Sequence, residues 1–437
     1  MGAQASCLRF PGILPGLSRP TKPRADAREL QARCLRSNMK RKILIVILGL
    51  VILSQVPFAY RRYCLRRLRN TIQQLAAQRV PPSPENEYID YNGVIHVHSF
   101  LGGHSTGTFA ELIAAAKANQ LDFVIMTEHP QAEFDTFAMT LTGTHAGVLF
   151  INGNEVASAN GDRLLLIPGT SNAASINLQS TQQIIEQQKL NGGLTLAAYP
   201  SDSDTWKSSA VDGVEVYNLF TNARQIRPIV LFFDGLWSYR SYADLMFANF
   251  FQRPDDNLRR WDTAMLNTNR KLVATAGNDA HSNVGVSLND DSGKQLIGVK
   301  LDPYERSFRT VRTHVLIKKG NGLTRESVLQ ALSQGHCYIS FDLFGEAAGF
   351  TFGVKNSDMI MGDEIASTTN SELDVQVPLA ARIVMIKNGN IVDQRQGTNA
   401  QFLATGPGVY RVEIYLDNLP APALGKPWII SNPVYLR

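Results

Sequence analysis

Residues 93–98 read Gly-Val-Ile-His-Val-His, an apolar, β-branched run that ends in two histidines. Such a run is typical of a buried strand. His96 and His98 flank Val97, so the two-residue period of a strand predicts that both imidazoles point to one face. Imidazole is the commonest metal ligand among side chains, and two of them on one face supply half of a metal site.

The same arrangement recurs along the chain, because further apolar runs end just before residues that can bind metals. These are residues 123–126 before His129, residues 148–151 before Glu155, and residues 272–275 before Asp279 and His281. Between the runs lie helical patterns, such as the one that begins with a capping box at Thr108 and Glu111. This alternation predicts an α/β fold with mostly parallel strands, which gathers reactive groups at the carboxyl ends of its strands.

Four of the eight histidines fall in these positions, and a fifth, His104, follows His98 across a glycine-containing loop to give the pattern H-x-H-x5-H. A single histidine is more often an ordinary core or surface residue, but five of them with two carboxylates at strand ends indicate a metal centre. The candidate ligands are His96, His98, His104, His129, Glu155, Asp279 and His281. Histidine-rich ligation suits zinc, manganese or iron.

A divalent ion lowers the pKa of bound water from 15.7 to about 7, which yields hydroxide at neutral pH. Glu155 and Asp279 would offset the metal charge and orient this hydroxide, so we take them as the candidate catalytic residues. Glu128 and Asn278 stand beside ligands and are candidates for orienting them from behind, although solvated loop positions are an equal alternative.

Four motifs resemble the PHP (polymerase and histidinol phosphatase) superfamily of metallo-hydrolases over about residues 91–340. They are His96-Val97-His98-Ser99, Thr127-Glu128-His129, Gly153-Asn154-Glu155 and Gly277-Asn278-Asp279-Ala280-His281. Segments between Ala380 and Tyr435 are similar to the C-terminal part of the carbaryl-hydrolase-like CehA/McbA branch. The resemblance implies a distorted (β/α)7 barrel with up to three metal ions, followed by a small C-terminal antiparallel β domain.

The resemblance also implies how the ligands divide. One ion would be held by His96, His98, Glu155 and Asp279, and another by His104, His129 and His281. A further site usually draws on a histidine in a His-Pro turn, but this chain has Tyr199 before Pro200. A neutral phenol with a pKa near ~10 is a poor ligand, and only Glu215 or Asn218 could replace it. We therefore expect two well-held ions and a weak or absent third.

Charge is distributed unevenly along the chain. Residues 1–80 contain sixteen Lys and Arg side chains and two acids, so the rest of the chain holds 27 basic and 36 acidic side chains. Because phosphate neutralisation by Lys and Arg supplies most nucleic-acid affinity, an acidic body argues against a nucleic-acid partner. We expect a small-molecule substrate instead.

Residues 43–60 form an apolar run of about 18 residues, at the lower end of what spans a bilayer. We interpret this run as a transmembrane signal anchor, with a cleaved signal peptide as the alternative. The expected location is single-pass in a bacterial inner membrane. Basic residues flank the run on both sides, so the side on which the catalytic domain lies stays open.

The remaining boundaries follow from composition. Residues 1–42 form a basic leader that is either disordered or an over-extended start, since Met39 begins a sequence that reads as a start of its own. We expect a stalk and linker at residues 61–86, the barrel at 87–344 and a β-sandwich-like domain at 345–437. Within the barrel, the aromatic-rich stretch Ile229–Arg260 is expected to form packed helices that cap it.

The leading prediction is a metal-dependent hydrolase that acts on a small phosphoester through a metal-bound hydroxide. A carbamate or carboxylic ester hydrolase is an alternative, because the same hydroxide would serve both reactions. A catalytically decayed, membrane-tethered binding module is the other alternative, and Tyr199 is its only support.

Overall fold

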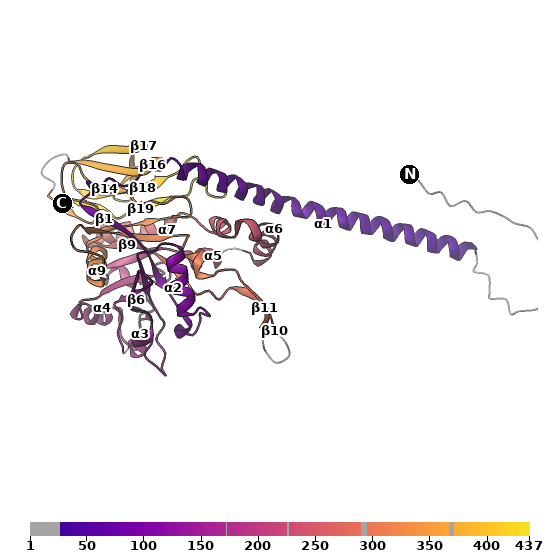
Figure 1. Cartoon of the computed structure of the whole chain (residues 1–437), viewed down its shortest axis with the longest axis horizontal. Helices are drawn as coiled ribbons and strands as arrows, with labels where there is room; N and C mark the ends of the chain where they lie inside the picture. Colours follow the sequence, from indigo (N-terminus) through magenta and orange to yellow (C-terminus); the bar gives the residue numbers. More distant parts are fainter. Residues whose placement is uncertain (1–26, 172, 225–226, 290–294, 367–370) are drawn as a thin grey trace, which may run out of the picture. The chain divides into compact units, whose positions relative to one another are not determined.

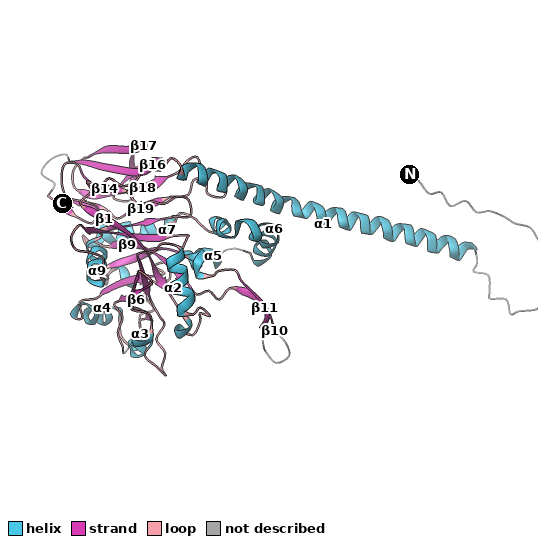
Figure 2. Cartoon of the chain, viewed as in Figure 1, coloured by secondary structure: helices cyan, strands magenta, loops and turns pink. Residues whose placement is uncertain are grey.

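The computed structural model describes residues 27–171, 173–224, 227–289, 295–366 and 371–437. The chain divides into two compact units, residues 1–59 and residues 60–437. Within the larger unit, helices and strands alternate along the chain to give a mixed α/β fold (Figure 1 and Figure 2). Most of the predicted basic leader, residues 1–26, lies outside the described residues.

Helix α1 (Ala27–Ala76) continues through the predicted anchor and into the predicted stalk. Its segment Arg36–Ala76 is long and apolar enough to cross a membrane, a test that a signal sequence would also pass. Beyond Tyr60 the helix belongs to the larger unit and buries Leu65, Leu68 and Leu75 there. The helical part of the predicted stalk is therefore packed onto the larger unit, and the bounds of the stalk stay a prediction.

The strands that carry the candidate ligands form one hydrogen-bonded array. They are β1 (Tyr88–Val97), β2 (Phe123–Met126), β4 (Val148–Ile151), β5 (Asn154–Ala157), β6 (Arg163–Ile167), β7 (Leu194–Ala198), β8 (Gly213–Asn218) and β9 (Val273–Ala280). Strand β1 lies between β2 and β9 and runs parallel to both. Strand β8 is parallel to β9 and β7, whereas β6 is antiparallel to β5 and β7. An isolated parallel bridge between Glu128 and Asn154 links the end of β2 to β5.

Alternation along these strands builds two layers of core. Ile95, Ile125 and Leu196 belong to one buried cluster. Their neighbours Val94 and Val124 belong to another, together with residues of helix α2 (Phe109–Ala118). Because successive side chains of a strand point to opposite faces, both faces of the central strands are buried. The predicted capping box at the start of α2 is confirmed.

The other helices connect or cover these strands. They are α3 (Thr136–Met139), α4 (Thr181–Leu190), α5 (Leu219–Arg224), α6 (Pro228–Met246), α7 (Asp255–Thr268), α8 (Tyr304–Ser307) and α9 (Arg325–Gln334). Helix α7 buries Leu258, Trp261 and Met265 in the main core. Helix α6 differs from α7 in its burial, because several of its large apolar side chains are exposed.

The C-terminal strands continue the same array. Strand β12 (Arg312–Lys318) pairs with β1, and β13 (Cys337–Ser340) joins β12 to β19. The strands beyond residue 345 are β14 (Thr351–Val354), β15 (Glu364–Ile365), β16 (Ser371–Lys387), β17 (Asn390–Ala404), β18 (Gly408–Tyr415), β19 (Ile429–Ser431) and β20 (Val434–Leu436). Their pairings are antiparallel except for β15 with β20. The predicted domain boundary at residues 344 and 345 stays a prediction.

Strands β3 (Gly143–His145), β10 (Gly285–Asn289) and β11 (Gln295–Lys300) form local hairpin pairings. β3 is antiparallel to β4, and β10 is antiparallel to β11.

Candidate metal centre

Four of the predicted ligands converge at the carboxyl ends of β1 and β9 and at the beginning of β5. One ligand atom from each of His96, His98, Glu155 and Asp279 lies within 4.8 Å of the others. All four side chains are buried. This is the same set of four that the family resemblance assigned to one ion, and a buried histidine–carboxylate cluster of this kind fits a centre for more than one metal ion.

The backbone departs from regular strand geometry at two of these residues. His96 has a φ of 67° and Asp279 a φ of 49°. The pairing of β1 with both β2 and β9 shifts register between Ile95 and Val97. Non-glycine residues in the left-handed region cost free energy and are concentrated at functional sites. The predicted convergence of His96 and His98 is thus achieved through an irregular strand end and not through simple alternation.

Glu215 of β8 positions His96 from behind. Its Oε2 atom lies 2.6 Å from Nδ1 of His96, while Nε2 of His96 lies 3.0 Å from Oε2 of Glu155. Both His96 and Glu215 are fully buried. A carboxylate on one ring nitrogen fixes the tautomer and aims the other nitrogen at a metal, which is how ligating histidines are commonly oriented.

The space that Glu215 occupies exists because residue 277 is glycine. A Cβ atom at Gly277 would lie only 1.8 Å from Oε2 of Glu215. Asn218 completes the support, since its amide donates to Oε1 of Glu215 at 2.7 Å and to Oδ2 of Asp279 at 3.3 Å. Asn218 thus connects the carboxylate behind His96 to a predicted ligand.

The electrostatics of this cluster favour cations. Burial alone would lower the pKa of His96, but the carboxylates of Glu215, Asp279 and Glu155 raise it well above its ordinary value. Burial alone would raise the pKa values of Glu155 and Asp279, but the histidines hold both below the usual range. The carboxylates are therefore ionised, and they retain a proton on the histidines that a bound metal ion would displace.

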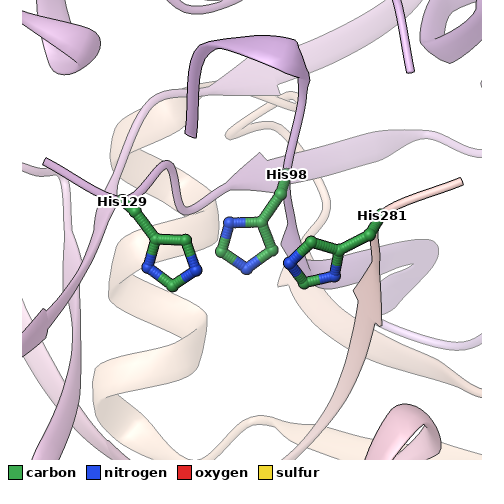
Figure 3. Close-up of side chains that lie close together, drawn as sticks. All are labelled: His98, His129 and His281. Atoms are coloured by element: carbon green, nitrogen blue, oxygen red, sulfur yellow. The ribbon is translucent and has the colours of Figure 1, made fainter. Parts of the chain in front are cut away.

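Three histidines form a second group beside the first. Figure 3 shows the ring of His98 between those of His129 and His281, and one ring nitrogen from each lies within 4.8 Å of the others. The ring centroid of His98 lies 4.5 Å from that of His129 and 4.3 Å from that of His281, and the rings of each pair are stacked. Burial lowers the pKa of His129 to about 3 and that of His281 to about 4, so both rings are neutral near pH 7 and able to ligate metal.

His104 lies at the edge of this second group. The sequence assigned it to one ion together with His129 and His281, but the described residues place His98 in that close group instead. His104 is exposed, and its ring centroid lies 5.3 Å from that of His129 in an edge-on arrangement. Ligation by His104 stays a prediction.

Tyr199 fills the position at which the third site is expected. It has a φ of 46°, and its hydroxyl donates to Oδ2 of Asp279 at 2.5 Å. Burial and then the nearby carboxylates raise the pKa of its phenol above the ordinary range, so the hydroxyl keeps its proton. It acts here as a hydrogen-bond donor to a predicted ligand.

Glu128 and Asn278 serve the loops and not the cluster itself. The Glu128 carboxylate accepts hydrogen bonds from the backbone NH of Ser99 and from the hydroxyls of Ser99 and Thr140. The Asn278 amide donates to the carbonyls of Ser307 and Val311. Glu128 therefore holds the backbone next to His98 from behind. Glu128 and Asn278 are both buried, so neither occupies the solvated loop position that was the alternative.

The cluster contains polar atoms that nothing in the described protein satisfies. Both ring nitrogens of His98 and Oδ1 of Asp279 are buried and accept or donate no hydrogen bond within the described residues. Buried polar atoms are almost always paired, because an unpaired one costs about 1–3 kcal/mol. Nε2 of His98 lies 3.3 Å from Oε2 of Glu155 and 3.6 Å from Oδ1 of Asp279. Metal ions at this point would satisfy these atoms, so the residues fit the predicted ions.

The cluster opens into a pocket with a volume of 840 Å³. The wall includes His104, Gln131, Asn177, Phe220 and Arg163. Sequence reasoning missed Arg163, whose Nη1 atom lies 3.8 Å from Oε1 of Glu155 and whose side chain is 46% exposed. A lone arginine at the first residue of a strand carries no signal in the sequence that would have singled it out.

No family model and no curated protein matches this chain. Among solved structures, it is similar to a two-domain protein from Bacteroides vulgatus ATCC 8482 that contains a predicted PHP-like metal-dependent phosphoesterase. The identity is 14% and the TM-score 0.37, over 81% of this chain and 98% of that one. It is also similar to PsfC from Pseudomonas syringae PB-5123, at 13% identity and a TM-score of 0.37, over 58% of this chain and 92% of that one. Both similarities are too distant to assign a function, which we therefore argue from the residues of this chain.

Proposed function

We propose that this protein is a metal-dependent hydrolase of the PHP type that acts on a small phosphoester. One observation carries the proposal: His96, His98, Glu155 and Asp279 are all buried and bring their ligand atoms within 4.8 Å of one another. Buried carboxylates are costly unless cations neutralise them, and metal ions can do so in place of the protons that His96 and His98 otherwise retain. Divalent zinc, manganese or iron suits these donors.

Each protein group has a role in this proposal. Divalent ions held by these residues would supply Lewis acidity and would make bound water more acidic. Glu215 holds His96 in the orientation that presents Nε2 to the centre. Tyr199 and Asn218 fix one oxygen of Asp279, which leaves its other oxygen for a metal. Glu155 and Asp279 provide the negative charge that retains the ions and orients the activated water.

The position of Arg163 favours an anionic substrate. Its guanidinium lies in the wall of the pocket and beside Glu155, where it can contact the charged oxygens of a phosphoester bound at the metals. The volume of 840 Å³ suits a small molecule. Hydrolysis of a carbamate or carboxylic ester needs no such cation. The substrate screen described below distinguishes this alternative from phosphoester hydrolysis. A decayed binding module would not need to keep buried ligand atoms in place.

The finer features of the fold are also proposed. We propose that β1, β2, β6, β7, β8 and β9, together with β4 and β5 as one bent strand, form the distorted seven-stranded barrel. The bridge between Glu128 and Asn154 supports closure, since it links β2 to β5. The C-terminal strands from residue 345 onward would form the β-sandwich-like domain of the CehA/McbA branch.

We further propose that α1 anchors the protein in a bacterial inner membrane as a single-pass signal anchor. The length and apolar composition of Arg36–Ala76 support this location. Retention of the full chain in the membrane fraction after carbonate extraction is the expected result. Release of the chain into the soluble fraction would contradict the anchor.

The hydrolase proposal is tested with the full chain, purified in detergent without chelator. We expect hydrolysis of para-nitrophenyl phosphate that a chelator abolishes and that zinc or manganese restores. A bis-para-nitrophenyl phosphodiester and an aryl carbamate, assayed in parallel, separate phosphoester from carbamate chemistry. Greater activity on the carbamate would favour the alternative reaction at the same centre.

A pair of matched variants assigns the activity to the centre. His98→Ala should abolish hydrolysis and reduce the metal content. His145→Ala removes a histidine of β3 whose ring contacts Thr142 and Phe150, and it should leave both unchanged. Full activity in His98→Ala, or no activity on any substrate from protein that holds its metals, would contradict the proposed function.

A further inference from the structure

Helix α6 (Pro228–Met246) has its polar and apolar faces reversed with respect to the usual surface helix. It buries Asp234 and Ser238, which are only 5% and 1% exposed. It exposes Ile229, Phe232 and Leu236 at 66%, 62% and 68%. A surface helix of a soluble protein normally shows the opposite pattern.

The exposed apolar residues of α6 form a single stripe. Ile229, Phe232 and Leu236 are spaced three and four residues apart, which places them on one face of a helix. Trp237, 37% exposed, stands beside this stripe. Arg240, one turn beyond Leu236, is also exposed. The sequence predicted that this aromatic-rich region would form packed helices capping the barrel, but this part of α6 presents its apolar side chains outward.

The inner face of α6 is bound to the segment that directly follows the apolar run of α1. Arg61 forms a two-pronged ion pair with the buried Asp234, at 2.6 to 2.9 Å. Arg62 donates to the carbonyl of Trp237 and to the hydroxyl of Ser241. Charge pairing on the inner face therefore explains the buried Asp234, and it leaves the outer stripe to be covered by something else.

We propose that the outer stripe of α6 lies in the interfacial layer of a lipid bilayer as a second membrane contact. The inference rests on the α1 anchor proposed above. Arg61 is the residue next to the end of the apolar run at Tyr60, so the ion pair holds α6 within side-chain reach of the point where the chain leaves the membrane.

Neighbouring side chains have the composition of a membrane interface. Tyr60 and Tyr63 are 62% and 55% exposed, and aromatic residues such as these and Trp237 favour the headgroup level. Arg66, Arg67 and Arg240 are exposed cations, which anionic headgroups attract. Apolar residues bordered by arginine on one helix are typical of helices that lie in the plane of the interface. The anchor and this contact together would restrict how the body can rotate above the membrane.

Trp237 provides a direct probe of this contact. The chain has four tryptophans, and Trp206, Trp261 and Trp428 are at most 1% exposed. Trp237 is therefore the only one of the four tryptophans that can contact lipid. The full chain is reconstituted in vesicles of phosphatidylcholine and phosphatidylglycerol whose acyl chains are brominated near the glycerol end. We expect quenching of one component of the tryptophan emission, and we expect Trp237→Phe to remove that component.

Variants on the stripe separate this contact from the anchor. Phe232→Glu combined with Leu236→Glu should lose most of the quenching while the chain stays in the vesicles and keeps its metal content. Leu190→Glu places the same charge at a leucine of α4 that is 88% exposed, and it should keep the quenching. Retained quenching in the double variant would overturn the lipid contact.

The remaining outcomes are also decisive. An anchored chain whose Trp237 is open to aqueous acrylamide and untouched by brominated lipid would overturn the α6 contact and leave the anchor intact. A Trp237 shielded from both quenchers would show that protein, such as a second copy of the chain, covers the stripe, and would likewise overturn the proposal. A chain that does not remain with the vesicles would overturn the anchor and this inference together, without bearing on the hydrolase.

Discussion

The hydroxyl of Tyr199 donates a hydrogen bond to Oδ2 of Asp279 at 2.5 Å. Asp279 is a predicted metal ligand, and its other carboxylate oxygen lies 3.5 Å from Nε2 of His96. The phenol thus takes up one oxygen of a carboxylate whose second oxygen faces the cluster. The protonated phenol therefore occupies the oxygen of Asp279 that a further metal ion would otherwise neutralise.

Replacing this phenol should change the number of bound ions. We expect wild-type protein to hold two tightly bound equivalents and Tyr199→His to hold one more, because imidazole is a good ligand and a protonated phenol is not. Tyr199→Phe, which only removes the hydroxyl, should gain none. Metal analysis after dialysis checks all three proteins, and three tight equivalents in the wild type would refute the prediction.

Glu215 should control metal affinity without touching a metal. Glu215→Gln removes the carboxylate that accepts from Nδ1 of His96, and loss of such a partner costs about 10–100-fold in affinity. Gly277→Ala should have a similar effect, since its Cβ atom would displace the Glu215 carboxylate. Competition with a chromogenic chelator measures the affinities.

The matched control for Glu215→Gln is Glu186→Gln. Glu186 is an exposed residue of α4 that pairs with Gln182, so its substitution should leave the affinity unchanged. Wild-type affinity in Glu215→Gln would show that the buried carboxylate has only a packing role.

Arg163 should select for charge on the substrate. We expect Arg163→Gln to raise KM for a phosphomonoester by about tenfold or more, since a hydrogen bond to a charged group contributes roughly 1.5–3 kcal/mol. KM for a neutral aryl ester or carbamate should hardly change. Steady-state kinetics on both substrates decide the matter, and an equal loss on both would indicate that Arg163 acts through Glu155 instead.

His314, which belongs to neither group of predicted ligands, should make the free energy of unfolding depend on pH. Its Nδ1 atom lies 2.8 Å from Oδ1 of Asp90, and its Nε2 atom lies 3.3 Å from Oδ2 of Asp342. Burial alone would lower the pKa of His314, but the two carboxylates raise it to about 10. Since the folded pKa exceeds the unfolded one, this contribution to stability is complete below about pH 6.5 and is lost as pH rises toward about 10.

His314→Gln should therefore reduce the free energy of unfolding by about 3 kcal/mol near pH 6, as expected when one partner of a buried ion pair is removed. The difference from wild type should shrink as pH approaches about 10. Urea unfolding of the full chain at both pH values measures it, with His145→Gln as the control. A difference that is the same at both values would mean that His314 is not charged in the folded protein.

Much of the cluster was predictable from the sequence because the positions of the predicted ligands follow a local rule. His98, His129 and His281 each come shortly after a buried strand, and parallel strands bring such positions to one edge. His96, His98, Glu155 and Asp279 were predicted as one set, and they lie together. His104 was grouped with His129 and His281, but its exposed loop position keeps it outside the close group of described residues.

The supporting residues were less accessible to sequence reasoning. Glu215 was considered only as a replacement ligand, whereas the structure places it behind His96, and Arg163 was not considered at all. Glu215 meets His96 although the two residues are 119 positions apart in the sequence, whereas Arg163 reaches Glu155 across the local pairing of β5 with β6. The sequence gives no sign of which of many acids and arginines will meet a given histidine.

The sequence by itself determined the mixed α/β alternation, the ligand types and the apolar segment of α1, because each depends on local periodicity or composition. Only the tertiary structure decided that Tyr199 binds Asp279, that Glu215 fills the space left by Gly277, and that α6 turns its apolar face outward. These features follow from packing between distant segments, where the burial of one group depends on all of its neighbours.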